Sequence, residues 1–359
     1  MSTRKVKYFS VNDLKKVEKD ADYIFLLGER ANGKSYAVKS HLLQQAFNNI
    51  TENKCYKQIG YIRRFDLDCK DSMCEPYFSD MPIQEITKGM YDSISVYRKK
   101  IYFGNVNNET GRVDRSVCIG NCYALSSAEH YKSLMYPHIT NIIYEEVVSE
   151  RNQYLYSEPF KLQQLISTIF RDRKGKVYLI GNTLSRMCPY YNEWGLEDVE
   201  KMNQGETIIY KYDNTIIKVH RTKSRDYNSG MFFGLASKNI TKGEYTTEQQ
   251  PHLKGKINDY NIMYEVVLKY NNFRYMMRFL RHKTDNFYVW YVEPKTTPIK
   301  EKTRVIALEY NPDVLWTNGF LPLTWSEEQA FKMLLVHKKV VFSDNLTGTE
   351  FNNIIHNFK

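Results

Sequence analysis

The chain has 359 residues, of which 42% are hydrophobic, and this length favours more than one domain, each with its own core. The mean hydropathy is −0.56, and no apolar run approaches the roughly 18 residues of a membrane span. The N-terminus also lacks the apolar centre of a secretory signal. We therefore predict a soluble intracellular protein with no membrane partner. Lys and Arg number 51 against 41 Asp and Glu, and the net charge of +10 favours polyanionic partners, with nucleic acid first among them.

The first predicted elements are a buried strand at Asp22–Leu27, a loop at Gly28–Gly33 and a helix at Lys34–Phe47. The loop and the helix start read GERANGKS, which matches the pattern G-x-x-x-x-G-K-[ST]. In that pattern backbone N–H groups and the helix N-terminus hold phosphates, while the Lys neutralises them. We therefore predict a P-loop that binds ATP through Gly28, Glu29, Arg30, Ala31, Asn32, Gly33, Lys34, Ser35 and Tyr36.

Further apolar runs predict strands, with a helix at about Pro159–Arg171 before the last of them. The strands are expected at Gln58–Arg63, Lys100–Phe103, Val117–Leu125, Asn141–Val148 and Lys176–Ile180. This alternation predicts the α/β fold of a P-loop NTPase, with a mostly parallel sheet and crossover helices.

Two adjacent carboxylates follow the apolar run NIIY, at Glu145 and Glu146. A P-loop enzyme needs an acidic element at the end of a second buried strand. We predict that Ser35 and Glu145 hold Mg²⁺, partly through water, and that Glu146 orients the attacking water as a general base. The alternative is that both carboxylates are the exposed end of a strand.

The strand Lys176–Ile180 leads into Gly181 and Asn182, and a polar side chain there can sense the γ-phosphate. Asn182 is the predicted sensor, and a turn-forming Asn is an equally weighted alternative. Arg171 and Arg173 end the preceding helix, where either could act as an arginine finger on a neighbouring subunit or complement the helix dipole.

Two arginines, Arg63 and Arg64, end the strand that follows the P-loop helix. Their guanidinium groups are expected near the nucleotide edge of the sheet, in contact with phosphate or DNA. A surface ion pair is the alternative.

The sequence pattern changes after about residue 200. We predict an ATPase domain at 1–200, a linker at 201–250 that contains a hairpin at Gly205–Lys218, and a smaller α+β domain at 251–359. The last domain is expected to contain strands at Tyr264–Tyr270, Phe273–Arg281, Phe287–Glu293 and Thr303–Glu309, then helices at Ser326–His337 and Gly348–Phe358.

With these segments in order, the chain resembles the podovirus encapsidation protein family, the DNA-packaging ATPases of small protein-primed podoviruses. The resemblance spans nearly the whole chain. Its densest parts are Gly28–Lys39, Tyr61–Arg64, Tyr136-Pro137 leading into Ile142–Glu146, Leu165–Arg173, Val177–Ser185 and Pro189-Tyr190.

The resemblance implies an ASCE-type motor ring of five subunits that acts in the host cytoplasm, docks on the portal vertex of the procapsid and drives double-stranded DNA inward with ATP. Lys34, Ser35, Glu145, Glu146 and Asn182 fall at its phosphate, metal, catalytic and sensor positions. Arg171 falls at a trans-acting arginine and Lys132 at a second trans-acting cation. The family has Asp where this chain has Glu145.

For the C-terminal domain the resemblance implies a ribonuclease-H-type nuclease that has lost its acidic metal cluster and serves for docking. Arg274, Arg278 and Arg281 lie on the strand where a two-metal nuclease needs a carboxylate, so DNA cutting is disfavoured. The domain could dock through a packaging RNA or through an acidic protein surface, because a basic aromatic domain suits either partner.

Three other functions are consistent with parts of the sequence. A nucleotide kinase or simple P-loop hydrolase explains residues 28–35 but not the basic C-terminal half. A nucleic-acid-binding or capsid-binding protein could use ATP as a structural ligand. A terminase-like ATPase with an active nuclease is the third.

Overall fold

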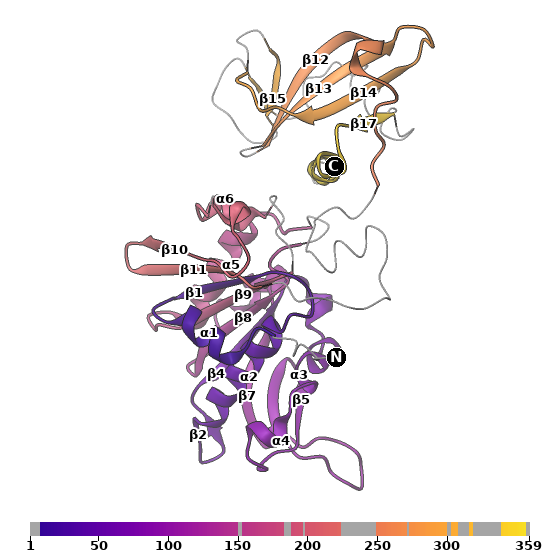
Figure 1. Cartoon of the computed structure of the whole chain (residues 1–359). Helices are drawn as coiled ribbons and strands as arrows, with labels where there is room; N and C mark the ends of the chain where they lie inside the picture. Colours follow the sequence, from indigo (N-terminus) through magenta and orange to yellow (C-terminus); the bar gives the residue numbers. More distant parts are fainter. Residues whose placement is uncertain are drawn as a thin grey trace, which may run out of the picture. The chain divides into compact units, whose positions relative to one another are not determined.

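The computed structural model describes residues 8–149, 153–182, 188–196, 198–223, 249–270, 273–299, 303–307, 316–318 and 339–356. The chain forms two compact units, and Figure 1 shows both. The described residues up to 223 belong to the first unit, and those from 249 onward belong to the second. No helix among the described residues is both long and apolar enough to cross a membrane.

The first unit is built on a nine-stranded sheet in the order β10-β11-β1-β9-β8-β4-β7-β6-β5. Its strands are β1 Tyr23–Leu27, β4 Gln58–Arg63, β5 Ser93–Tyr97, β6 Lys100–Gly104, β7 Val117–Ala124, β8 Ile139–Glu145, β9 Lys176–Gly181, β10 Thr207–Tyr212 and β11 Thr215–Arg221. The strands from β11 to β7 pair in parallel, and antiparallel strands border them on both sides. The carboxyl ends of the parallel strands therefore share one edge of the sheet, where ligands bind in open α/β sheets.

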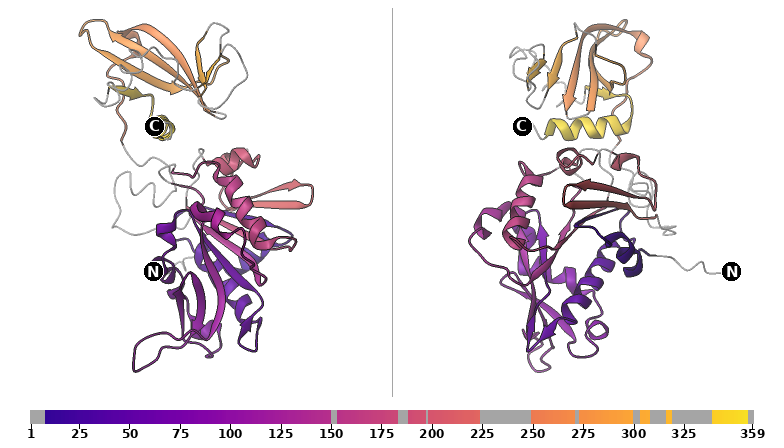
Figure 2. Two further views of the ribbon diagram at one scale, coloured as in Figure 1. Left: turned by 180° about the vertical axis from the view of Figure 1, so that it is seen from behind. Right: turned by 90° about the vertical axis from the view of Figure 1, so that its left-hand side faces the viewer.

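Helices cover both faces of this sheet, in two layers that Figure 2 shows from the side. Side chains of β1 alternate between them, since Ile24 and Leu26 pack with the first layer and Phe25 and Leu27 with the second. Burial on both faces explains why this strand reads as a continuous apolar run. The first layer contains α1 Val11–Glu18, α2 Lys34–Phe47, α3 Asp71–Ser79 and α4 Ile83–Ile86; the second contains η2 Leu125–Tyr131, α5 Glu158–Phe170 and α6 Pro189–Glu193.

The predicted mostly parallel sheet with crossover helices is confirmed, and each strand expected before residue 181 is present. Smaller elements complete the unit: β2 Ile50–Thr51, β3 Lys54–Cys55, η1 Asp66–Cys69 and η3 Val199–Lys201.

The hairpin expected within a linker instead belongs to the nine-stranded sheet. Strand β11 pairs in parallel with β1 over five residues, from Tyr23 opposite Ile217 to Leu27 opposite Arg221. The apolar residues Ile217 and Val219 are buried in the core of the first unit, and this burial holds the hairpin there. A linker beginning at residue 201 is therefore too early; the rest of the expected linker, 224–248, lies outside the described residues.

Helix α1 was not predicted, although its sequence carries a start signal. The Ser10 side chain accepts a hydrogen bond from the Asp13 backbone N–H, and the Asp13 carboxylate accepts one from the Ser10 backbone N–H. This capping box precedes Leu14 and Val17, which are the buried residues of the helix. The helix brings the chain before β1 against the loop that follows β1, since the Phe9 N–H donates to the Asn32 carbonyl.

The second unit contains a six-stranded sheet in the order β16-β15-β12-β13-β14-β17. Its elements are η4 Ile257–Asp259, β12 Tyr260–Tyr270, β13 Phe273–His282, β14 Tyr288–Pro294, β15 Val305–Ala307, β16 Trp316–Asn318, β17 Val340–Phe342 and α9 Asn345–His356. The three long strands are antiparallel, and Phe351 of α9 packs on Tyr275 and Phe342. The helix predicted at 326–337 lies outside the described residues.

Candidate functional site

The loop after β1 requires glycine at both of its ends. Gly28 has φ of 145° and Gly33 has φ of 97°, in the region that favours glycine. A Cβ at Gly28 would lie 2.2 Å from the Thr222 Oγ1, and one at Gly33 would lie 2.9 Å from the Phe9 carbonyl oxygen. The loop is therefore packed closely between the segment before β1 and the end of β11.

Lys34 begins α2, and its side chain turns back into the loop. The ammonium donates to the Gly28 carbonyl at 3.1 Å, the Glu29 carbonyl at 2.6 Å and the Asn32 Oδ1 at 3.1 Å. Lys34 is only 3% exposed. Burial lowers its pKa to about 8, against the opposing effect of the Glu145 and Glu29 carboxylates. A cation is thus buried at the N-terminus of α2, a position that suits a polyphosphate.

Glu145 ends β8 and faces the start of α2. It is 7% exposed and accepts a hydrogen bond of 2.6 Å from the Tyr77 hydroxyl, and the Ser35 hydroxyl lies near it. Burial raises the pKa of the Glu145 carboxyl, while Tyr77, Ser35 and Lys34 oppose that shift. The structure thus brings together Lys34, Ser35 and Glu145, as the sequence predicted.

Glu146 is the first residue after β8 and has φ of 58°, an unfavourable backbone conformation for a residue with a Cβ. This turn directs its side chain away from the buried path of β8, and the side chain is 55% exposed. The Arg63 Nη2 donates to the Glu146 Oε2 at 3.0 Å. Water can therefore reach the carboxylate, and an adjacent guanidinium sets its orientation.

Arg64 does not point into solvent, as a DNA or phosphate contact would require, but forms a buried ion pair with Glu158. Its Nε donates to the Glu158 Oε2 at 2.8 Å, and its Nη2 donates to the carbonyls of Glu146 and Val147. Glu158 is 1% exposed and also accepts bonds from the hydroxyls of Tyr144 and Tyr190. This network ties the ends of β4 and β8 to the start of α5.

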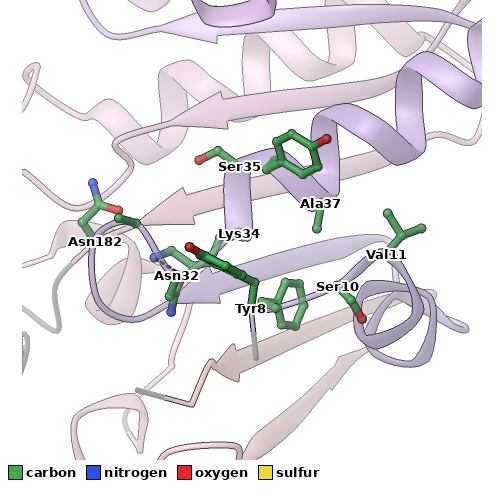
Figure 3. A pocket seen from close by; sticks show the side chains of 12 residues that line it. Tyr8, Ser10, Val11, Asn32, Lys34, Ser35, Ala37 and Asn182 are labelled. Carbon is green, nitrogen blue, oxygen red and sulfur yellow. Dashed lines mark hydrogen bonds between the residues drawn. The ribbon is translucent and has the colours of Figure 1, made fainter. Parts of the chain in front are cut away.

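Two cavities border these residues. One of about 600 Å³ runs from residues 31–37 to residues 8–11, and Figure 3 shows Lys34 between Asn182 on one side and Ser10 and Val11 on the other. The other, of about 280 Å³, is lined by both glutamates, by Arg30 and Arg63, and again by Asn182. Asn182 therefore stands between the loop and Glu146. Tyr36 lines the larger cavity and is about half exposed.

The side chains at this edge fit a magnesium–nucleotide. Mg²⁺ prefers hard oxygen ligands and keeps several of its waters, so it needs only one or two protein groups beside the phosphates. The Ser35 hydroxyl and the Glu145 carboxylate, which lie near each other, provide such groups. Across the described residues no cluster of three or more His, Cys, Asp or Glu side chains could hold a metal by itself.

The two arginines at the end of α5 differ in what they contact. Arg173 donates to the carbonyls of Tyr136, Pro137, Ile139 and Ile169, so it braces the start of β8. Arg171, which has φ of 51°, donates to the Leu134 carbonyl at 3.3 Å. Lys132, two residues before Leu134, pairs with Glu129 at the surface. Neither Arg171 nor Lys132 lines the two cavities beside Lys34 and Glu146.

The three arginines of β13 lie in the second unit. Arg278 is paired on both sides, with Glu265 at 2.6 Å and Glu293 at 2.5 Å, while Arg274 and Arg281 are exposed. The carboxylates on this part of the sheet are thus neutralised by an arginine.

Sequence reasoning missed Tyr77 and Thr222. Tyr77 lies 68 positions before its partner Glu145, and the sequence offered no signal for it. Thr222 follows β11 at the same edge as the loop; its hydroxyl accepts from the Asn32 side chain and donates to the Leu27 carbonyl. Placing the hairpin in the sheet would have identified it, because polar residues after parallel strands gather at that edge.

Comparison with known proteins places the chain among phage proteins. Residues 4–246 match the family model described as Podovirus DNA encapsidation protein (Gp16). The chain is 30% identical over 186 residues to a DNA packaging protein of Bacillus phage B103, covering 49% of each, and 24% identical over 221 residues to that of Bacillus phage phi29, covering 61% of this chain and 58% of the other. It therefore spans about half the length of the curated relatives it matches.

Among solved structures, a chain of the bacteriophage Phi-29 viral genome packaging motor assembly matches with a TM-score of 0.55 and 16% identity, over 98% of this chain and 100% of the other. At that identity the match supports the mixed α/β fold with its large, mostly parallel sheet. The family model covers more than half of the sequence, and the resemblance seen in the motifs is confirmed: the chain belongs to the podovirus DNA encapsidation protein family.

Proposed function

We propose that the chain is a viral DNA-packaging motor whose first unit is an ASCE-type P-loop ATPase. One observation carries the proposal: the buried Lys34 ammonium, the Ser35–Glu145 pair and the water-accessible Glu146 converge at one sheet edge in a member of this family. ATP and Mg²⁺ are the cofactors that this arrangement suits.

In the proposed binding mode, the loop amides and Lys34 hold the β- and γ-phosphates of ATP. The carbonyl partners of Lys34 give way to phosphate oxygens, which are better partners for a buried cation. Ser35 and Glu145 would hold Mg²⁺, partly through water, and the ion would supply positive charge beside the phosphates. The cavity beside residues 8–11 and Tyr36 has room for the nucleoside.

In the proposed hydrolysis step, the Glu146 carboxylate accepts a proton from a water molecule as the water oxygen bonds to the γ-phosphorus. The bond between that phosphorus and the β–γ bridging oxygen breaks, and the products are ADP and phosphate. Asn182, which borders both cavities, is positioned to report the loss of the γ-phosphate.

Arg171 is the better candidate for a finger acting in trans, because Arg173 already donates to four carbonyls. Helix α5 has 13 residues and begins beside Arg64, which contacts the Glu146 carbonyl. At about 1.5 Å per residue, Arg171 lies roughly 20 Å from that end, too far to serve the Glu146 of its own chain. We propose that Arg171 and Lys132 complete the site of the next subunit in a ring, for which the family implies five members.

The second unit is proposed to be a docking and nucleic-acid-binding module, a vestigial ribonuclease-H-like domain that attaches the ring to the portal of the procapsid in the host cytoplasm. Arg278 between two glutamates and the lack of a metal-binding cluster among the described residues argue against nuclease activity. The net charge of +10 supports contact with double-stranded DNA, and a packaging RNA is a further proposed partner.

The test is DNA-stimulated ATPase activity in mixtures of Lys34→Ala and Arg171→Ala subunits, each inactive alone. An arginine that works across the interface predicts partial recovery in the mixture, because an Arg171 from one subunit can meet an intact Lys34 in the next. No recovery at any ratio, with both variants shown to assemble, contradicts the trans assignment. No stimulation of the wild type by DNA contradicts the motor.

A terminase-like enzyme with a live nuclease is the main alternative. It predicts nicking of plasmid DNA in the presence of Mn²⁺, which the proposed docking module does not produce.

A further inference from the structure

Tyr77 of α3 contacts the proposed metal-binding edge, although it belongs neither to the phosphate loop nor to the end of a strand. Its hydroxyl donates to the Glu145 Oε1 at 2.6 Å. Burial and the nearby Glu145 carboxylate raise the pKa of the Tyr77 hydroxyl well above its usual value, so it keeps its proton and acts as the donor.

The Tyr77 ring is fixed on two sides. It stacks on Tyr61 of β4, with ring centroids 4.4 Å apart and planes 18° from parallel. The Lys39 ammonium lies over the same ring at 4.5 Å from its centroid and donates to the Tyr77 carbonyl at 2.6 Å. Asp80, paired with Lys39, holds that ammonium in place. The direction of the hydroxyl is therefore set by packing.

Helix α2 connects Lys39, which helps to fix the Tyr77 ring, to the phosphate loop. Lys39 comes four residues after Ser35, so both lie on one face of α2. The Ser35 hydroxyl lies near the Glu145 carboxylate, while Lys39 holds the tyrosine that donates to this carboxylate. A glutamate has three rotatable side-chain bonds, and the hydrogen bond from Tyr77 restricts where its carboxylate can lie.

We propose that Tyr77 is a positioning residue for the metal: it holds the Glu145 carboxylate toward Ser35, so that one carboxylate oxygen is directed at the hydration shell of Mg²⁺. The inference rests on the proposed function of the loop. Outer groups that orient a metal ligand typically contribute 10–100-fold to metal affinity. Tyr77 would thus set the Mg²⁺ requirement of nucleotide binding without touching the nucleotide.

The test measures the affinity of full-length protein for a fluorescent, non-hydrolysable ATP analogue as a function of Mg²⁺ concentration. Tyr77→Phe keeps the ring and removes the hydroxyl, and we expect it to raise the half-saturating Mg²⁺ concentration about tenfold. Affinity in EDTA should stay within about twofold of wild type, since the loop amides and Lys34 are unchanged. Tyr178→Phe is the matched control, because Tyr178 also donates to a carboxylate, Glu18, away from the loop.

A double variant separates loss of the Tyr77–Glu145 hydrogen bond from a general loss of stability in Tyr77→Phe. Glu145→Asp withdraws the carboxylate by one methylene, out of reach of the Tyr77 hydroxyl, so adding Tyr77→Phe to Glu145→Asp should change the Mg²⁺ requirement less than twofold. Equal Mg²⁺ requirements in Tyr77→Phe and Tyr178→Phe, or full additivity of the double variant, overturn the inference. Wild-type protein that binds the analogue without any Mg²⁺ dependence instead contradicts the proposed function.

Discussion

The two units of this chain differ in how far their charged side chains are buried. The first buries Lys34, Arg64, Glu145 and Glu158 at the carboxyl edge of a parallel sheet. In the second, Arg278 is only partly buried between two partly exposed glutamates, and the charged side chain that is buried among the described residues is Glu350 of α9. Buried charges are costly, and they persist where backbone groups and partners are arranged around them.

From this difference in buried charge we infer which unit holds the catalytic site. Parallel strands deliver their ends to one edge, so residues far apart in sequence, such as Lys34 and Glu145, meet there. The long antiparallel strands of the second unit alternate side chains between two faces and collect no comparable group of buried charges among the described residues. We propose that catalysis takes place in the first unit and that the second unit serves for surface recognition.

The largest expected effect comes from removing the buried cation. Lys34→Ala should lower ATPase activity about 100-fold or more, because the phosphates lose their central positive partner. Steady-state phosphate release measures this, with Lys16→Ala of α1 as an exposed-lysine control that should retain activity. ATPase activity of Lys34→Ala within a few-fold of the wild-type value would contradict the proposal that the buried cation of the first unit binds the phosphates.

Next in size is the buried ion pair. Glu158→Gln leaves the Arg64 guanidinium without a charged partner in the core, and we expect a loss of about 3 kcal/mol in the free energy of unfolding. Denaturant unfolding of the full chain, followed by fluorescence, measures this. A loss under 1 kcal/mol in the free energy of unfolding would mean that water reaches the Arg64–Glu158 pair. The two units would then not differ in how far their charged side chains are buried.

A smaller effect is expected in the second unit. Arg278→Met removes a partly buried cation between Glu265 and Glu293, and the free energy of unfolding should fall by about 1 kcal/mol. Basal ATPase activity should not change. Arg281→Met, at an exposed position of the same strand, is the control. Loss of basal turnover in Arg278→Met alone would contradict the division of roles.

The pH dependence of nucleotide binding is the mildest test. The pKa of Lys34 is lowered to about 8, so above that pH the nucleotide-free protein must take up a proton to bind phosphates, and affinity should fall about tenfold per pH unit. The same group has the opposite effect on stability: its folded pKa lies below the unfolded one, so stability of the nucleotide-free protein rises from about pH 8 toward 10.5. Calorimetry in two buffers of different ionisation enthalpy measures the proton uptake, and Lys34→Met should abolish it.

The strands and the phosphate loop could be predicted from sequence because their signals are local: apolar runs, helical spacing and a fixed glycine–lysine pattern. The partners of the site residues could not. Tyr77 and Arg64 reach Glu145 and Glu158 across 68 and 94 positions, and only the folded sheet brings them together. The hairpin of β10 and β11 was placed in a linker because its half-polar sequence gave no indication that it pairs with β1.

Glu146→Gln tests the central claim most directly, because it keeps the shape of the side chain and removes only the proton acceptor. The account predicts that this variant binds ATP with Mg²⁺ as tightly as wild type and retains it unhydrolysed, in a single-turnover assay that separates binding from phosphate release. Hydrolysis of the bound ATP at the wild-type rate would contradict the account.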